Sequence, residues 1–159
     1  MGMESKFIWK NGELAPFEQA TLHFLTPALH YGAAVFEGIR AYNTPKGPAV
    51  FRLREHVERL FDSARVLGFR EFPWSVEEAI KAHKDTVRAN GFTDCYIRPL
   101  MYLDGGGWNL NVDGGKLSMM IAVWFGRGAS IRPSALRGSG LPCGRGTSRE
   151  PGVPRLPTC

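Results

Sequence analysis

Residues 51–68 read FRLREHVERLFDSARVLG, and their apolar side chains recur at the spacing of a helix. The pattern places one apolar stripe along an amphipathic helix, with charged residues on the opposite face. Gly68 follows the last apolar position and can end the helix in the left-handed conformation, which glycine adopts without strain. This stretch therefore predicts a helix that buries one face, and its apolar positions are Leu53, Val57, Leu60, Phe61, Ala64 and Leu67.

A second helix is predicted after it, and a hairpin is predicted near the N-terminus. Ser75 and Glu78 have the spacing of a capping box, and the apolar pattern that follows ends at Asn90-Gly91. Asn11-Gly12 separates two apolar runs, and both residues accept the positive φ angles of a tight β-turn. The chain is therefore expected to open with two antiparallel strands.

Four further runs are compatible with β-strands. Residues 33–42 and 49–52 flank a turn-rich segment, whereas residues 95–103 and 116–124 flank a glycine-rich loop. Pro99 lacks a backbone N–H and is expected to interrupt the first of the later strands. The order of strands, two helices and strands predicts an α+β domain, in which an antiparallel sheet carries two helices on one face.

The net charge of +5 is concentrated at the C-terminal end of the chain. Up to residue 124, six Lys and eight Arg balance fourteen Asp and Glu, whereas the remaining residues hold six Arg against Glu150 alone. That last segment is rich in Gly, Pro and Ser and has no apolar period. We therefore predict a domain over residues 1–124 and a disordered Arg/Gly/Pro-rich tail over residues 125–159.

Several classes of protein are excluded or disfavoured by composition. The longest apolar run is far shorter than the roughly 18 residues that a membrane span needs, so we expect a cytoplasmic protein without a membrane partner. Three cysteines without C-x-x-C spacing and four unpaired histidines predict no disulfide framework and no metal site. Six scattered arginines without aromatic partners are only a weak indication of nucleic-acid binding.

Arg98 and Arg59 are the candidate binding residues. Strand alternation would place Tyr96, Arg98 and two further side chains on one sheet face, where a guanidinium beside phenols suits a carboxylate; a solvated sheet face is the alternative. Arg59 lies beside the apolar stripe of the first helix. Glu55 and Asp62 lie within one helical turn of it, so spacing alone favours a surface ion pair.

Residues 28–42, ALHYGAAVFEGIRAY, closely resemble the N-terminal motif of branched-chain amino acid aminotransferases, which are class IV, fold-type-IV enzymes that use pyridoxal 5'-phosphate. Residues 7–12, 46–48, 51–60 and 96–100 resemble the same family in the same order. The resemblance covers residues 7–124, which correspond to the family's small N-terminal domain. D-amino acid aminotransferase and aminodeoxychorismate lyase share this domain but resemble residues 30–40 less well.

The resemblance implies roles for individual residues. Arg59 would bind the cofactor phosphate, and Arg98 with Tyr96 would receive the carboxylates of glutamate or 2-oxoglutarate. Phe36 and Tyr31 would line the pocket for a branched side chain, with Tyr31 reaching in from the neighbouring subunit of a dimer-based homo-oligomer. The implied substrate-binding positions are Tyr31, Phe36, Gly38, Tyr96, Arg98 and Leu110, the last in a loop that also holds Trp108.

The implied activity transfers an amino group from leucine, isoleucine or valine to 2-oxoglutarate. The family's Schiff-base lysine lies in a larger C-terminal domain, and none of the six lysines matches it. We therefore expect no catalytic residue in this chain and no activity from it alone, and we interpret residues 125–159 as an out-of-frame translation. Two alternatives are a scaffold whose arginine-rich tail binds nucleic acid and a regulatory subunit that pairs with a separate second domain.

Overall fold

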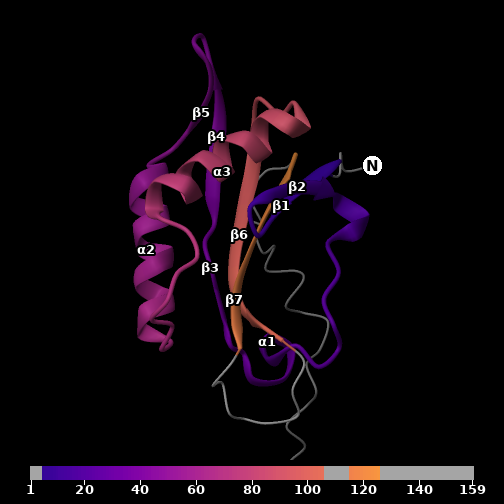
Figure 1. The fold of residues 1–159 in the computed structure, drawn as a ribbon. Helices are drawn as coiled ribbons and strands as arrows, with labels where there is room; N and C mark the ends of the chain where they lie inside the picture. Colours follow the sequence, from indigo (N-terminus) through magenta and orange to yellow (C-terminus); the bar gives the residue numbers. More distant parts are fainter. Residues whose placement is uncertain (1–4, 106–114, 126–159) are drawn as a thin grey trace, which may run out of the picture. The chain divides into compact units, whose positions relative to one another are not determined.

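The computed structural model describes residues 5–105 and 115–125, in which strands precede and follow two long helices (Figure 1). The strands are β1 (Phe7–Lys10), β2 (Glu13–Pro16), β3 (Ala34–Phe36), β4 (Ile39–Thr44), β5 (Gly47–Val50), β6 (Cys95–Asp104) and β7 (Lys116–Trp124). The helices are η1 (Phe17–Gln19), a 3₁₀ turn, and α1 (Pro27–Tyr31), α2 (Leu53–Val66) and α3 (Val76–Asn90).

The local turn and cap signals produce the predicted elements. Asn11 and Gly12 have φ angles of 51° and 114° and join β1 to β2 as a tight hairpin. The Ser75 hydroxyl accepts a hydrogen bond from the Glu78 backbone N–H at 3.2 Å, and the Glu78 carboxylate accepts one from the Ser75 N–H at 2.8 Å. Gly68 follows α2 with a φ angle of 103°. The hairpin and both long helices are therefore confirmed.

All strands belong to one antiparallel sheet. Its order is β2-β1-β7-β6-β4-β5, and β3 pairs with β6 in line with β4. Strand β6 runs through Pro99 without a break, so the predicted interruption is wrong. The Pro99 carbonyl accepts a hydrogen bond from the backbone N–H of Glu37 at 3.2 Å. The missing N–H of Pro99 therefore faces the gap between β3 and β4, where no ladder bond is lost.

The main core lies between one face of this sheet and the two long helices. Helices α2 and α3 lie on this same face (Figure 1). Their buried residues include Val57, Leu60, Phe61, Ala64 and Ala79, and the sheet contributes Ile39, Ile97, Met119, Ile121 and Val123. The opposite face carries a smaller cluster around Tyr102, against which Ala28 of α1 packs. The α+β class with two helices on one sheet face is thus confirmed.

Some elements differ from the sequence-based predictions. Helix α1 and the turn η1 were not predicted, because three to five residues are too short to display a helical period. The predicted strand over residues 33–42 is divided into β3 and β4, and the turn after β4 is confined to Pro45 and Lys46. The proposed tail over residues 125–159 lies outside the described residues except for Phe125. Among the described helices, none is both long enough and apolar enough to cross a membrane.

Candidate functional site

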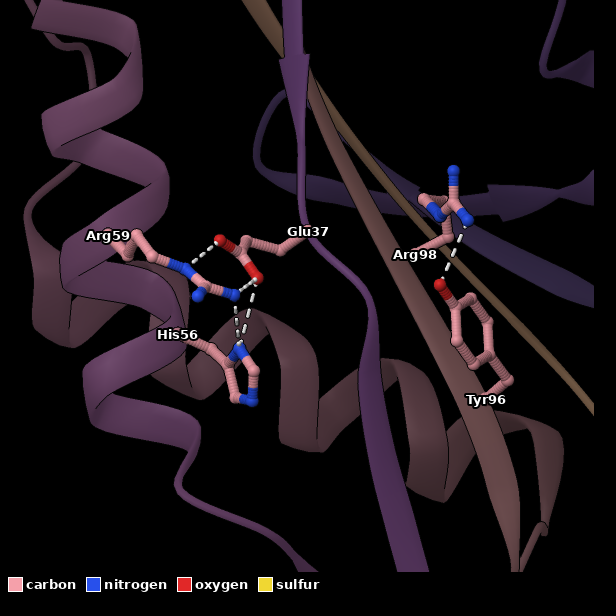
Figure 2. A network of polar contacts seen from close by, with 5 residues as sticks. All are labelled: Glu37, His56, Arg59, Tyr96 and Arg98. Carbon is pink, nitrogen blue, oxygen red and sulfur yellow. Dashed lines mark hydrogen bonds and ion pairs between the residues drawn. The ribbon is translucent and has the colours of Figure 1, made fainter. Parts of the chain in front are cut away.

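Arg98 lies on β6, and the Tyr96 side chain of the same strand points towards it (Figure 2). Its Nη2 donates a hydrogen bond to the Tyr96 hydroxyl oxygen at 2.9 Å. Its guanidinium carbon lies 4.4 Å from the centroid of the Phe36 ring and 5.3 Å from that of Tyr96. These contacts leave Arg98 partly buried, and its buried Nε has no hydrogen-bond partner among the described residues.

Gly38 makes the position of Tyr96 possible. The register Phe36↔Leu100 and Ile39↔Ile97 continues across the gap between β3 and β4 and places Gly38 opposite Arg98. A Cβ atom at residue 38 would overlap the Tyr96 hydroxyl. The absent side chain therefore leaves the space that the phenol occupies.

The group formed by Phe36, Gly38, Tyr96 and Arg98 can bind a carboxylate. The Tyr96 hydroxyl already accepts a bond from Arg98, so its own proton is left for another acceptor. A guanidinium edge and a phenol proton are donors that suit the two oxygens of a carboxylate. Phe36 is 59% exposed beside them, and its ring supplies apolar surface for the rest of such a ligand.

Arg59 lies on α2 and does not form the surface ion pairs that its spacing favoured. Its Nε and Nη2 donate to the two carboxylate oxygens of Glu37 at 2.5 and 2.6 Å (Figure 2). The two nearby carboxylates bond other arginines: Glu55 bonds Arg52, and Asp62 bonds Arg65. The interpretation of Arg59 as a partner of Glu55 or Asp62 is therefore wrong.

Glu37 is a buried carboxylate with two partners on α2. It is 5% exposed, and the Nδ1 atom of His56 lies 3.0 Å from its Oε2. A carboxylate can only accept, so Nδ1 must carry the proton in this bond. Burial acts to raise the pKa of Glu37, but hydrogen bonds and charges from Arg59 and His56 lower it overall. Glu37 is therefore ionised, and it raises the pKa of Arg59.

Sequence reasoning missed both Glu37 and His56 as partners of Arg59. Residue 37 lies between Val35 and Ile39, which both pack into the core, so strand alternation turns its side chain towards the helices. Applying strand alternation to residues 35–39 would have placed the Glu37 carboxylate on the core side of the sheet. Such a carboxylate needs a cation, and that requirement was the available signal.

Arg59 and His56 border a small pocket of about 310 Å³ at the N-terminal half of α2. The pocket is lined by Phe51, Arg52, Glu55, His56 and Arg59. Arg59 and His56 lie on the helix side of the sheet, whereas Tyr96 and Arg98 project from the other face (Figure 2). The structure therefore does not bring Arg59 into contact with the carboxylate-binding group.

Tyr31 makes no hydrogen bond or ring contact with this group in the part of the chain that the structure describes. Tyr31 ends α1 with 55% of its surface exposed, and its one ring neighbour in the described part of the chain is His30, at 6.0 Å. Leu110 and Trp108 lie outside the described residues. A larger cavity of about 650 Å³, lined in part by Lys46 and Lys84, contains none of the predicted site residues.

Comparisons with known proteins point to one family. A model of the class IV amino-transferase family matches residues 34–136, which extends past Trp124. The branched-chain-amino-acid aminotransferase of Pseudomonas aeruginosa is 45% identical over 117 residues, covering 74% of this chain and 38% of that protein. The Escherichia coli K12 protein of the same name is 42% identical over 133 residues, covering 84% and 43%.

Solved structures give the same result. The T.th. branched-chain amino acid aminotransferase, complexed with N-(5'-phosphopyridoxyl)-L-glutamate, has a TM-score of 0.72 and 47% identity over 76% of this chain and 40% of its own. The Escherichia coli enzyme has a TM-score of 0.73 and 42% identity over 78% and 41%. The chain thus spans about two fifths of the length of the relatives it matches. Because the family model covers well over half of this sequence, the chain belongs to the class IV aminotransferase family.

Proposed function

We propose that this domain supplies the substrate-carboxylate and cofactor-phosphate parts of a branched-chain amino acid aminotransferase. The reaction would exchange an amino group between leucine, isoleucine or valine and 2-oxoglutarate. The observation that carries the proposal is the group of Arg98, Tyr96 and Phe36, which combines cationic and phenolic donors with an exposed aromatic ring. The branched-chain relatives support this choice of substrate.

One pocket can accept both substrates because this group has two kinds of surface. The side-chain carboxylate of glutamate or 2-oxoglutarate would be bound by Arg98 and Tyr96. A branched aliphatic side chain would instead contact the ring of Phe36 and leave the guanidinium paired with the phenol. Tyr31 would complete the pocket of a neighbouring subunit, which accords with its exposure in this chain.

The residues around Arg59 fit the phosphate end of pyridoxal 5'-phosphate. Arg59 keeps N–H groups that Glu37 does not use, and its side chain is 65% exposed at the 310 Å³ pocket. A guanidinium edge matches the geometry of a phosphate dianion. When bound, this cofactor supplies the electron sink that stabilises negative charge at the substrate α-carbon.

The lysine that such a reaction needs is proposed to come from outside the described domain. All six lysines of the chain lie within the described residues, and none of them lines the pocket beside Arg59. The described domain would therefore bind and orient substrate and phosphate without performing the proton transfer. Soluble amino acids and 2-oxo acids as substrates also make the cytoplasm the expected location.

The test joins residues 1–136 to the part of the Escherichia coli relative that the alignment does not cover. We expect this chimera to form glutamate from L-leucine and 2-oxoglutarate, and the 159-residue chain to form none. Arg98→Leu should raise the KM for 2-oxoglutarate at least roughly tenfold and change that for leucine less, because a charge-assisted bond is lost. Asp62→Asn, an exposed change on α2, should leave both values unchanged.

Four outcomes would contradict parts of the proposal. A chimera that uses D-alanine in preference to L-leucine would favour D-amino acid aminotransferase, and release of pyruvate from aminodeoxychorismate would favour the lyase. An equal effect of Arg98→Leu on both substrates would argue against a carboxylate-specific role. Turnover by the 159-residue chain alone would show that the lysine lies within it.

A further inference from the structure

The contact between Glu37 and Arg59 joins a buried group to an exposed one. Glu37 is 5% exposed on the helix side of the sheet, whereas the side chain of Arg59 is 65% exposed. The carboxylate is thus buried, and the mostly exposed side chain of Arg59 reaches it from α2 (Figure 2). The long side chain of Arg59 on the surface of α2 is therefore held by the buried carboxylate of Glu37.

The Glu37 carboxylate binds only one edge of the Arg59 guanidinium. Arginine has five N–H donors, and Glu37 occupies one on Nε and one on Nη2. Nη2 also lies 3.4 Å from Nδ1 of His56. Both donors on Nη1 remain, and they point away from the carboxylate because the guanidinium is planar. The free edge is therefore presented to the pocket in one orientation.

His56 holds the carboxylate in turn. It lies one helical turn before Arg59 on α2, and its Nδ1–H donates to the same Oε2 atom that receives Arg59 Nη2. This bond opposes rotation of the carboxylate about its terminal torsion. His56, Glu37 and Arg59 thus form a chain in which each group restricts the next.

We infer that Glu37, supported by His56, is a positioning residue that fixes the Arg59 guanidinium for a phosphate ester. The inference rests on the proposed role of Arg59 in binding the cofactor phosphate. Neither Glu37 nor His56 needs to touch the phosphate itself. Their contribution is that Arg59 is already ordered before the anion binds.

Charge and positioning predict opposite effects of removing Glu37. The negative charge of Glu37 repels a phosphate dianion, so neutralising it would strengthen binding if charge alone mattered. If Glu37 acts by positioning, neutralising it releases the guanidinium, and the anion must then order a flexible side chain. The cost of ordering one such side chain corresponds to roughly two- to tenfold in affinity. The sign of the change therefore separates the two mechanisms.

The experiment compares pyridoxine 5'-phosphate with pyridoxine, which differ by the phosphate and carry no aldehyde that could react with lysines. Binding of each to the 159-residue chain is followed by NMR titration, and the ratio of the two affinities isolates the phosphate contribution. We expect a preference for the phosphate in the wild-type chain and a two- to tenfold smaller preference in Glu37→Gln. Asp62→Asn removes another carboxylate–arginine pair from α2 and should leave the preference unchanged.

A pair of His56 variants tests the inference if Glu37→Gln does not fold. His56→Asn keeps a donor near the position of Nδ1 and should retain the phosphate preference, whereas His56→Leu should reduce it. Unchanged or increased preference in Glu37→Gln, or equal values in the two His56 variants, would overturn the inference. A wild-type chain that binds both compounds equally would instead contradict the role of Arg59 under the proposed function, and the positioning role with it.

Discussion

At the scale of the residue, the main finding is that a glycine and a phenol share one small space. The Tyr96 hydroxyl lies where the Cβ of any larger residue at position 38 would stand. The same hydroxyl accepts the bond from Arg98, so the two contacts are coupled through one atom. The absence of a side chain at residue 38 thus sets the position of a cation on the neighbouring strand.

This coupling gives a double-mutant test. Gly38→Ala should destabilise the chain by about 1–2 kcal/mol, because the added methyl group displaces the phenol from a packed position. Tyr96→Phe removes the overlapping oxygen, so Gly38→Ala should cost less in that background than in the wild type. Urea unfolding of the four proteins measures both costs. Strictly additive free energies would show that the overlap relaxes without involving Tyr96.

Contacts between residues that are far apart in the sequence were the part of the site that could not be predicted. Tyr96 and Arg98 were placed on one face by strand alternation, and the hydrogen bond between them accords with that placement. Glu37 and Arg59 are 22 positions apart and meet only because α2 packs over the segment between β3 and β4, which carries Glu37. Helical spacing favoured Glu55 and Asp62 as partners of Arg59, and nothing in the local sequence argued against either of them. Only the packing of the helix on the sheet separates these alternatives.

At the scale of the element, predictions succeeded where the signal was contained in a few neighbouring residues. The Asn11-Gly12 turn and the Ser75–Glu78 cap both depend on local backbone geometry, and both form as predicted. The continuity of β6 through Pro99 depends instead on the gap between β3 and β4, which local sequence does not reveal. The strand order is likewise determined by pairing between distant segments.

The cap of α3 offers a test at this scale. Ser75→Ala removes the acceptor for the Glu78 N–H and should lower the free energy of unfolding by about 1 kcal/mol. Glu77 lies in the first turn of α3, next to the cap, and forms an exposed ion pair with Arg54 of α2. Glu77→Gln weakens this ion pair and should have a smaller effect than Ser75→Ala. Urea unfolding at pH 7 distinguishes them. Equal effects of the two substitutions would show that the exposed ion pair contributes as much to stability as the cap, contrary to this prediction.

At the scale of the whole molecule, the change in composition and the end of the family match fall at different residues. The basic excess begins after residue 124, whereas the family match continues to residue 136. The neutral part of the sequence contains every described member of the candidate site. The overall charge therefore carries no information about the ligands of the domain. The stability of this domain is, however, expected to depend on pH, because the domain contains a buried histidine, His83.

His83 lies inside α3 and is fully buried. Its Nδ1 bonds the Ala79 carbonyl oxygen at 2.7 Å, and its Nε2 has no partner among residues 5–105 and 115–125. Burial, which disfavours the charged ring, lowers the pKa of His83 to about 4 from an ordinary value of 6.5. The unfolded chain therefore binds a proton at this residue at a higher pH than the folded chain does.

We therefore expect the chain to lose stability as the pH falls from about 6.5 to about 4, by about 3 kcal/mol from His83 alone. The contribution is fully present above the unfolded pKa and is lost below it, because the unfolded state gains the proton first. Urea unfolding at pH 7 and pH 4.5 measures the loss. His83→Leu puts an apolar side chain of similar bulk in the place of the imidazole and should lose less stability over the same interval than the wild type. Parallel curves for the two proteins would show that acidic side chains, rather than His83, account for the pH dependence.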